Sequence, residues 1–106
     1  MCIRDRFIIL YRFKVKPKRI DDFKKAWRGL TELIYKHEGS LGSRLHKNNN
    51  DDFIAYAQWP SELIFEASGD KLPDVANDFR EIMREACDEI EVLHKMIVVE
   101  DLLKNE

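Results

Sequence analysis

The side chains best suited to chemistry in this sequence are one histidine, one arginine and one tryptophan: His46, Arg80 and Trp59. An imidazole titrates near neutral pH, so His46 is the clearest candidate for a general base. The guanidinium of Arg80 could stabilise an anion, and the indole of Trp59 could form an aromatic wall. Each residue also has a structural interpretation: a surface histidine beside a turn, an arginine at the edge of an apolar helix face, and a tryptophan of the core.

The segment FIAYAQW, residues 53–59, has an unusual choice of side chains for a strand. Alternation places Ala55 and Ala57 on the same face as two large aromatic residues, Phe53 and Trp59. Small side chains between large ones indicate either a closely packed helix or a cavity above the strand. We predict a cavity that binds a small hydrophobic or aromatic ligand. The residues expected around it are Tyr11, Trp59 and Phe65 as walls, Ala55 and Ala57 as the floor, and His46 and Arg80 at the rim.

The first half of the chain is expected to supply a strand, a helix and a hairpin. Residues 7–15 alternate as a strand, and from about residue 19 to 38 apolar side chains recur at spacings of three and four, typical of an amphipathic helix. Gly39 marks the C-terminal end of that helix. Strands over residues 40–47 and 53–59 are joined by an asparagine-rich turn, which predicts a hairpin.

The second half has a similar plan. Ser61 is placed to cap a short helix. A second amphipathic helix is expected over residues 74–89, with Cys87 and Ile90 on its apolar side, and a last strand within residues 92–103. The order β-α-β-β-α-β predicts an α+β fold: a ferredoxin-like, split β-α-β antiparallel sheet with helices on one face.

The other face of this sheet is expected to be too apolar for solvent, because it carries Ile8, Leu10, Ile54 and Tyr56. We expect a second copy of the chain to cover it, so that two sheets pack face to face in a homodimer. The alternative is a monomer with an exposed apolar sheet.

Composition narrows the classes of function. We interpret residues 1–6 as a disordered or non-native leader and residues 7–106 as a single domain. The net charge of −2, with both signs interleaved, argues against nucleic-acid binding. The longest clean apolar runs have four residues, too few for a membrane span or a signal peptide. Two cysteines without CxxC spacing indicate no disulfide framework and no metal site, so the cytoplasm is the expected compartment.

Three stretches in this order resemble the antibiotic biosynthesis monooxygenase family: YRFKVKP before an amphipathic helix, then EGSLGSRLHK, then FIAYAQWPS. The resemblance extends from residue 7 to about residue 100. It implies a dimeric α+β barrel in which each subunit holds a ligand pocket between its sheet and its helices.

The resemblance also implies an activity. One branch of the family oxidises polycyclic aromatic phenols of polyketide pathways without metal or flavin, because the substrate anion itself reduces oxygen. His46, Trp59 and Arg80 match the His, Trp and Arg of that branch's pocket. Ala55 and Phe65 stand where the branch has an Asn and a Tyr, so two hydrogen-bonding groups are missing.

A haem-degrading branch of the same fold matches less well. Its strand Asn, helix Trp and axial His align with Tyr11, Ser68 and Met83. Haem is not expected without the axial histidine. We therefore expect no cofactor and no metal.

Two functions remain open. The first is a cofactor-independent monooxygenase that oxidises a small electron-rich aromatic or quinol substrate with molecular oxygen, with His46 as the base and Arg80 as the stabiliser of the substrate anion. The second is a non-catalytic dimeric module that binds a small hydrophobic ligand or has a structural role. His46 and Arg80 favour the first, whereas Ala55 and Phe65 favour the second, and the sequence leaves open whether the protein is an enzyme.

Overall fold

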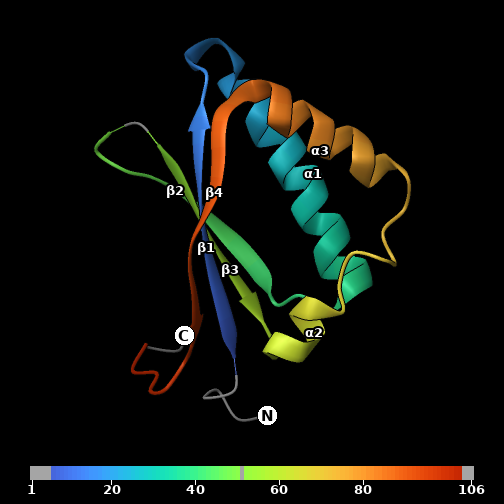
Figure 1. The fold of residues 1–106 in the computed structure, drawn as a ribbon, viewed down its shortest axis with the longest axis vertical. Coiled ribbons are helices and arrows are strands. Elements are labelled where there is room, and N and C mark those ends of the chain that lie inside the picture. Colours follow the sequence, from blue (N-terminus) through green and yellow to red (C-terminus); the bar gives the residue numbers. More distant parts are fainter. Residues whose placement is uncertain (1–5, 51, 104–106) are drawn as a thin grey trace.

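A computed structural model describes residues 6–50 and 52–103, which form a four-stranded antiparallel sheet with helices on one face (Figure 1). The strands are β1 (Phe7–Val15), β2 (Gly42–Lys47), β3 (Phe53–Trp59) and β4 (Cys87–Ile97), in the spatial order β2-β3-β1-β4. The helices are α1 (Ile20–Glu38), α2 (Glu62–Glu66) and α3 (Val75–Ala86), with a 3-10 turn at Pro17–Arg19. The predicted α+β, ferredoxin-like arrangement is confirmed.

The ends of the first two α-helices follow their sequence signals. Asp21 and Asp22 lie in the first turn of α1, where carboxylates are stabilised by the helix dipole. Gly39 ends the helix in the left-handed conformation, with a φ of 81°. The Ser61 hydroxyl accepts a hydrogen bond of 3.2 Å from the Ile64 N–H and so caps α2.

The two central strands bring large and small side chains side by side. β1 and β3 pair with Tyr11 opposite Ala55 and Ile9 opposite Ala57. All four residues face the helices, because alternate residues of a strand point to opposite sides of the sheet. On this face β3 therefore contributes only the two small side chains between Phe53 and Trp59.

Two clusters of buried side chains hold the helices on the sheet. In the first, the Phe23 ring of α1 lies 5.0 Å from the ring of Phe13 and 5.6 Å from that of Phe53, centroid to centroid. The second cluster joins Phe7, Ile9 and Trp59. Tyr11 packs against both clusters. We infer that the helices meet the sheet firmly at both ends and leave its middle less filled.

Helices α1 and α3 approach each other closely at Gly29. A Cβ atom added at Gly29 would lie 2.5–2.9 Å from three atoms of the Phe79 ring. A larger side chain would therefore displace the ring or push the helices apart. The absence of a side chain at Gly29 thus allows the Phe79 ring, next to Arg80 in the chain, to pack against α1.

Helix α3 is shorter than the sequence predicted. It was expected over residues 74–89, but it ends one residue before Cys87, which begins β4. The assignment of Cys87 and Ile90 to the helix was wrong, because both residues pair with β1: Cys87 lies opposite Val15 and Ile90 opposite Phe13. Pairing with a central strand overrides a local helical pattern.

The outer face of the sheet, turned away from the helices, is partly covered within the single chain. Ile8 is 2% exposed, and it lines a cavity together with residues 96–103. Leu10, Ile54 and Tyr56 are half-buried. Of the four residues predicted to meet a second copy, Ile8 is thus already buried by its own chain.

Most of the predicted leader, residues 1–5, lies outside the described residues. Arg6 is described: its carbonyl accepts a hydrogen bond of 3.0 Å from the Val98 N–H, and its guanidinium donates to the Gln58 side chain at 3.2 Å. Arg6 therefore continues the contacts of the sheet beyond the start of β1.

Candidate functional site

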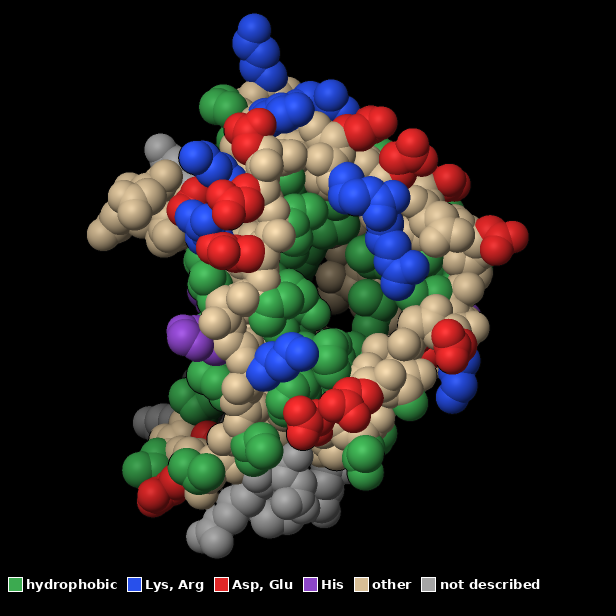
Figure 2. Space-filling view, in the orientation of Figure 1, with side chains coloured by type: hydrophobic (Ala, Val, Ile, Leu, Met, Phe, Trp, Pro, Cys, Tyr) green, Lys and Arg blue, Asp and Glu red, His purple; other side chains and the backbone are tan. Residues whose placement is uncertain are grey.

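A cavity of about 390 Å³ lies between the sheet and the helices. Figure 2 shows a hollow surrounded by hydrophobic side chains, with Lys and Arg side chains beside its mouth. Its volume is at the small end of the range for ligand pockets, roughly 300–1,000 Å³. Its lining includes Tyr11, Thr31, Glu38, Ser40, Ala55, Ala57, Trp59, Phe65, Ser68, Met83, Arg80 and Arg84.

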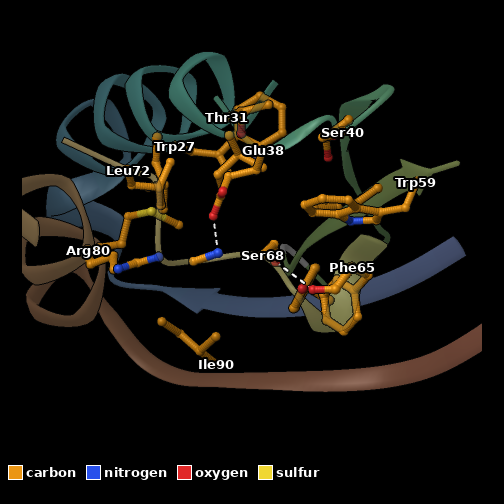
Figure 3. A pocket seen from close by; sticks show the side chains of 18 of the residues that line it. Trp27, Thr31, Glu38, Ser40, Trp59, Phe65, Ser68, Leu72, Arg80 and Ile90 are labelled. Carbon is orange, nitrogen blue, oxygen red and sulfur yellow. Dashed lines mark hydrogen bonds between the residues drawn. The ribbon is translucent and has the colours of Figure 1, made fainter. Parts of the chain in front are cut away.

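Six of the seven side chains that the sequence assigned to a site line this cavity: Tyr11, Ala55, Ala57, Trp59, Phe65 and Arg80. They come from β1, β3, α2 and α3, so the fold brings together residues from four elements. Figure 3 shows Arg80 on one side of the cavity, with Trp59 and Phe65 on the opposite side.

Trp59 and Phe65 form the aromatic end of the cavity. Their ring centroids are 5.4 Å apart, with an angle of 71° between the ring planes, which is a favourable edge-to-face contact. The Phe65 ring also contacts Phe7 at 5.4 Å, and the Lys95 ammonium lies 5.9 Å from its centroid. These contacts hold both rings in place, so they can act as fixed walls for a flat ligand.

The two alanines of β3 differ in how much space lies above them. Ala55 is 1% exposed and packs within the Phe23 cluster, although it also touches the cavity. Ala57 is partly exposed and belongs to neither cluster of buried residues. The open part of the floor therefore lies over Ala57.

Tyr11 offers a hydrogen-bond donor on the floor of the cavity. Burial raises the pKa of the Tyr11 phenol above its ordinary value of 10.0, because the charged phenolate is poorly solvated there. The hydroxyl therefore stays protonated and can donate. Tyr11 lies opposite Ala55, beside the position where the resemblance implied a missing asparagine.

Arg80 and Arg84 supply the positive charge of the cavity lining. Both lie on α3, one helical turn apart, with Arg80 half-buried and Arg84 exposed. Within the described residues, neither guanidinium forms an ion pair with a carboxylate. Unpaired positive charge beside an apolar cavity favours an anionic ligand or a ligand that becomes anionic.

His46 does not reach the cavity. It lies opposite Ile54 in the pairing of β2 with β3, so its exposed ring is on the outer face of the sheet. Its Nδ1 is 3.2 Å from the Ile54 carbonyl oxygen. The expectation that His46 stands at the rim was wrong, because its strand register turns it to the other face.

The sequence model for antibiotic biosynthesis monooxygenases matches residues 6–71, more than half of the 106 residues. The chain belongs to this family. The matched part ends before α3, which carries Arg80 and Arg84. The chain has no significant match among curated proteins.

Solved structures extend the comparison over the whole fold. SnoaB from Streptomyces nogalater, a cofactor-independent oxygenase, superposes with a TM-score of 0.73 at 13% identity, covering 94% of this chain and 99% of its own. A protein from Caulobacter crescentus gives a TM-score of 0.75 at 16% identity, with 92% and 93% covered. Rv0793 from Mycobacterium tuberculosis gives 0.70 at 10% identity, with 92% and 99% covered. At these identities the likeness shows the fold.

Glu38 and Ser40 belong to the stretch EGSLGSRLHK that carries the resemblance, but the sequence did not assign them to a site. They are 7% and 8% exposed, the two buried polar side chains among the described residues, and both line the cavity. Glu38 follows Ile34 by four residues on the apolar side of α1, and that spacing is the signal that could have found it. A glutamate on an apolar helix face is unusual, because its charge must be buried.

The described residues contain no group of three His, Cys, Asp or Glu side chains arranged to hold a metal ion. Met83, which the resemblance aligns with the axial histidine of the haem-degrading branch, is 7% exposed and lines the cavity. None of the described helices is both long enough and apolar enough to cross a bilayer.

Proposed function

We propose that the protein is a cofactor-independent monooxygenase that oxidises a small electron-rich aromatic phenol or quinol with molecular oxygen. The observation that carries the proposal is an apolar cavity that has a fixed aromatic wall, Trp59 and Phe65, and an unpaired cation, Arg80, on the opposite side (Figure 3). Membership of the monooxygenase family supports it. So does the shared fold of SnoaB, a cofactor-independent oxygenase.

Such chemistry needs no bound cofactor, because the substrate supplies the electrons. The substrate loses its hydroxyl proton and transfers one electron to O₂, which gives a phenoxyl radical and superoxide. Their recombination forms a carbon–oxygen bond at a ring carbon, that carbon loses its proton, and the O–O bond breaks. One phenol and one O₂ become one quinone and one water, and the phenol supplies all four electrons. The apolar lining of the cavity limits the contact of the radical pair with water.

The residues of the cavity have distinct roles in this proposal. Arg80 stabilises the negative charge that develops on the reduced oxygen and on the substrate oxygen. Trp59 and Phe65 hold the aromatic ring in one orientation. The Tyr11 hydroxyl donates to an oxygen of the substrate, in place of the donors that Ala55 and Phe65 lack.

A second candidate function is supported by those two residues. Ala55 and Phe65 line the cavity without any hydrogen-bonding group, so the cavity has fewer donors than the resemblance implies for the active branch. A non-catalytic module that binds a small hydrophobic ligand needs only the apolar lining. This alternative predicts binding of aromatic compounds with no consumption of oxygen.

Oxygen consumption separates the two functions. Purified protein should be supplied with a panel of one-ring and two-ring phenols and quinols in an oxygen electrode, with ¹⁸O₂ used to find label in the product. Arg80→Met should lower the rate about tenfold to a hundredfold, because a hydrogen bond to a charged group contributes roughly 1.5–3 kcal/mol. Arg28→Met is the matched control, since Arg28 is exposed on α1 and lies outside the cavity lining.

The oxygenase is supported if the unaltered protein forms labelled product and if the rate falls in Arg80→Met but not in Arg28→Met. Binding of phenols without oxygen uptake by the unaltered protein would favour the binding module instead. Equal rates in both arginine variants would remove the role assigned to Arg80.

We also propose that two copies of the chain pair through the outer sheet face. Leu10, Ile54 and Tyr56 are half-buried there, and Met96 of β4 is 37% exposed beside Ile8. An apolar sheet face of this kind is more stable when a partner covers it. A second copy offers the same apolar face, as a two-fold symmetric contact requires.

A further inference from the structure

Glu38 is a buried acidic residue of the cavity lining. It is the last residue of α1, where the helix dipole is negative, and it is 7% exposed. One carboxylate oxygen, Oε2, accepts a hydrogen bond from the Gly69 N–H in the loop after α2. Within the described residues, the other oxygen, Oε1, has no hydrogen-bond partner.

The carboxylate lies inside the cavity. Figure 3 shows Glu38 reaching from α1 into the space between Arg80 on one side and Trp59 on the other. A hydroxyl group on a ring held against Trp59 would therefore lie near the one carboxylate of the cavity lining.

Two neighbouring hydroxyls are occupied elsewhere. Ser40 donates to the Gln58 carbonyl at 3.3 Å and accepts from the Gly42 N–H at 2.9 Å. Ser68 donates to the Phe65 carbonyl at 2.6 Å. The free oxygen of Glu38 is therefore the strongest proton acceptor that faces the cavity.

We propose that Glu38 is the general base of the cavity and that it selects substrates with an aromatic hydroxyl group. This inference rests on the proposed function. The substrate binds as the neutral phenol, and its O–H donates to Glu38 Oε1. As an electron passes to O₂, the O–H bond breaks, the proton moves to the carboxylate, and the bonding pair stays on the substrate oxygen. Glu38 returns the proton when the O–O bond breaks, and it leaves in the water that is formed.

The cavity volume sets the size of the substrate. At about 390 Å³ the cavity is near the lower limit for ligand pockets. We expect a phenol of one or two rings. The ring would lie against the aromatic wall with its hydroxyl toward Glu38, and the site of oxygen attack would face Arg80.

Glu38→Gln separates a base from a structural contact. The glutamine amide keeps an oxygen that can accept from the Gly69 N–H, so the link between α1 and the loop can persist. It lacks the negative charge and cannot take a proton. Glu32→Gln is the matched control, because Glu32 is an exposed residue of the same helix outside the cavity lining.

The experiment has a spectroscopic arm and a kinetic arm. In the first, 4-nitrophenol is bound to each protein, and the pH at which it becomes the coloured phenolate is measured. A neighbouring carboxylate disfavours the phenolate, so this midpoint should fall by about one to three pH units in Glu38→Gln. In the second, the rate of oxygen uptake with the best phenol should fall about 10²–10⁴-fold in Glu38→Gln, as for loss of a general base.

Each outcome decides the matter. Both effects in Glu38→Gln, with neither in Glu32→Gln and with thermal melting unchanged, support the base. If Glu38→Gln keeps its rate and its titration midpoint while the unaltered protein oxidises phenols, the proposed function stands and Glu38 is only a structural contact. If the unaltered protein neither binds 4-nitrophenol nor consumes oxygen with any phenol, both the proposed function and the base are refuted.

Discussion

Replacing Ala57 by leucine should block the cavity with little loss of stability, whereas the same replacement at Ala55 should destabilise the fold. Both alanines face the helices and touch the cavity. Ala55 is 1% exposed and packs in the cluster of Phe23 and Met83, so additional carbon atoms meet filled space. Ala57 is partly exposed to the cavity, so a leucine there enters open space.

The magnitudes follow from packing. Overpacking a filled site costs about 1–3 kcal/mol. Since 1 kcal/mol shifts the melting temperature of a domain near this size by about 4–8 °C, Ala55→Leu should melt roughly 4–24 °C lower. At Ala57, three added carbon groups could contribute up to about 2.4 kcal/mol of burial at about 0.8 kcal/mol each. Ordering the leucine costs about 0.5–1 kcal/mol. Ala57→Leu should therefore melt at or slightly above the temperature of the unaltered protein.

The assay pairs thermal melting with binding of 1-naphthol, followed by quenching of tryptophan fluorescence. All proteins are compared at one concentration, because self-association raises the apparent melting temperature. We expect Ala57→Leu to keep its melting temperature and lose at least tenfold in affinity, a difference of about 1.4 kcal/mol. If it melts as low as Ala55→Leu, or binds 1-naphthol as tightly as the unaltered protein, there is no usable space over Ala57.

Two further predictions concern the assembly and the buried thiol. Ile54→Asp should convert a dimer to a monomer or to aggregates, because an unpaired charge buried in an interface costs several kcal/mol. Light scattering at micromolar concentration measures the mass of each protein. A monomeric mass for the unaltered protein would refute the dimer proposal. Burial, with a smaller contribution from Asp88, raises the pKa of the Cys87 thiol to about 11 from 9.0. At pH 8 iodoacetamide should therefore alkylate Cys87 about a hundredfold more slowly than an ordinary thiol, and the rate should rise up to about pH 11. Mass spectrometry of the Cys87 peptide measures this rate. Fast labelling at pH 8 would contradict the burial of the thiol.

The sequence was a good guide where local chemistry marks the structure. Alternation predicted β1 and β3, and Gly39 and Ser61 marked helix ends, because a left-handed glycine and a capping hydroxyl act within a few residues. The boundary between α3 and β4 could not be found in this way. The chain passes from Ala86 to Cys87 without a glycine or proline, and only pairing with β1 shows where the helix stops.

The residues of the candidate site differ in the same way: the sheet face of some could be predicted from local sequence, and that of His46 could not. Trp59, Ala55 and Ala57 share a strand whose two faces are easily told apart, so their side of the sheet could be predicted. His46 lies on a strand with few apolar residues, where the register, and hence the face, is weakly marked in the sequence. The resemblance to the family, and not the strand pattern, placed His46 at the rim of the cavity, whereas its pairing with Ile54 puts the ring on the other face.

Assigning the role of base to Glu38 instead of His46 changes how the substrate is expected to bind. A histidine at the rim would have suited an anion drawn in by Arg80. A carboxylate inside the cavity repels an anion, so Glu38 and Arg80 together favour a neutral phenol that becomes charged only as it reacts. In the ground state the hydroxyl donates to Glu38, and Arg80 has no full charge to stabilise. Once an electron has moved to oxygen, the proton is on Glu38 and the new negative charge faces Arg80. Glu38, which takes the proton, and Arg80, which faces the new negative charge, therefore stabilise the products of electron transfer more than the bound substrate. That difference is what accelerates a reaction.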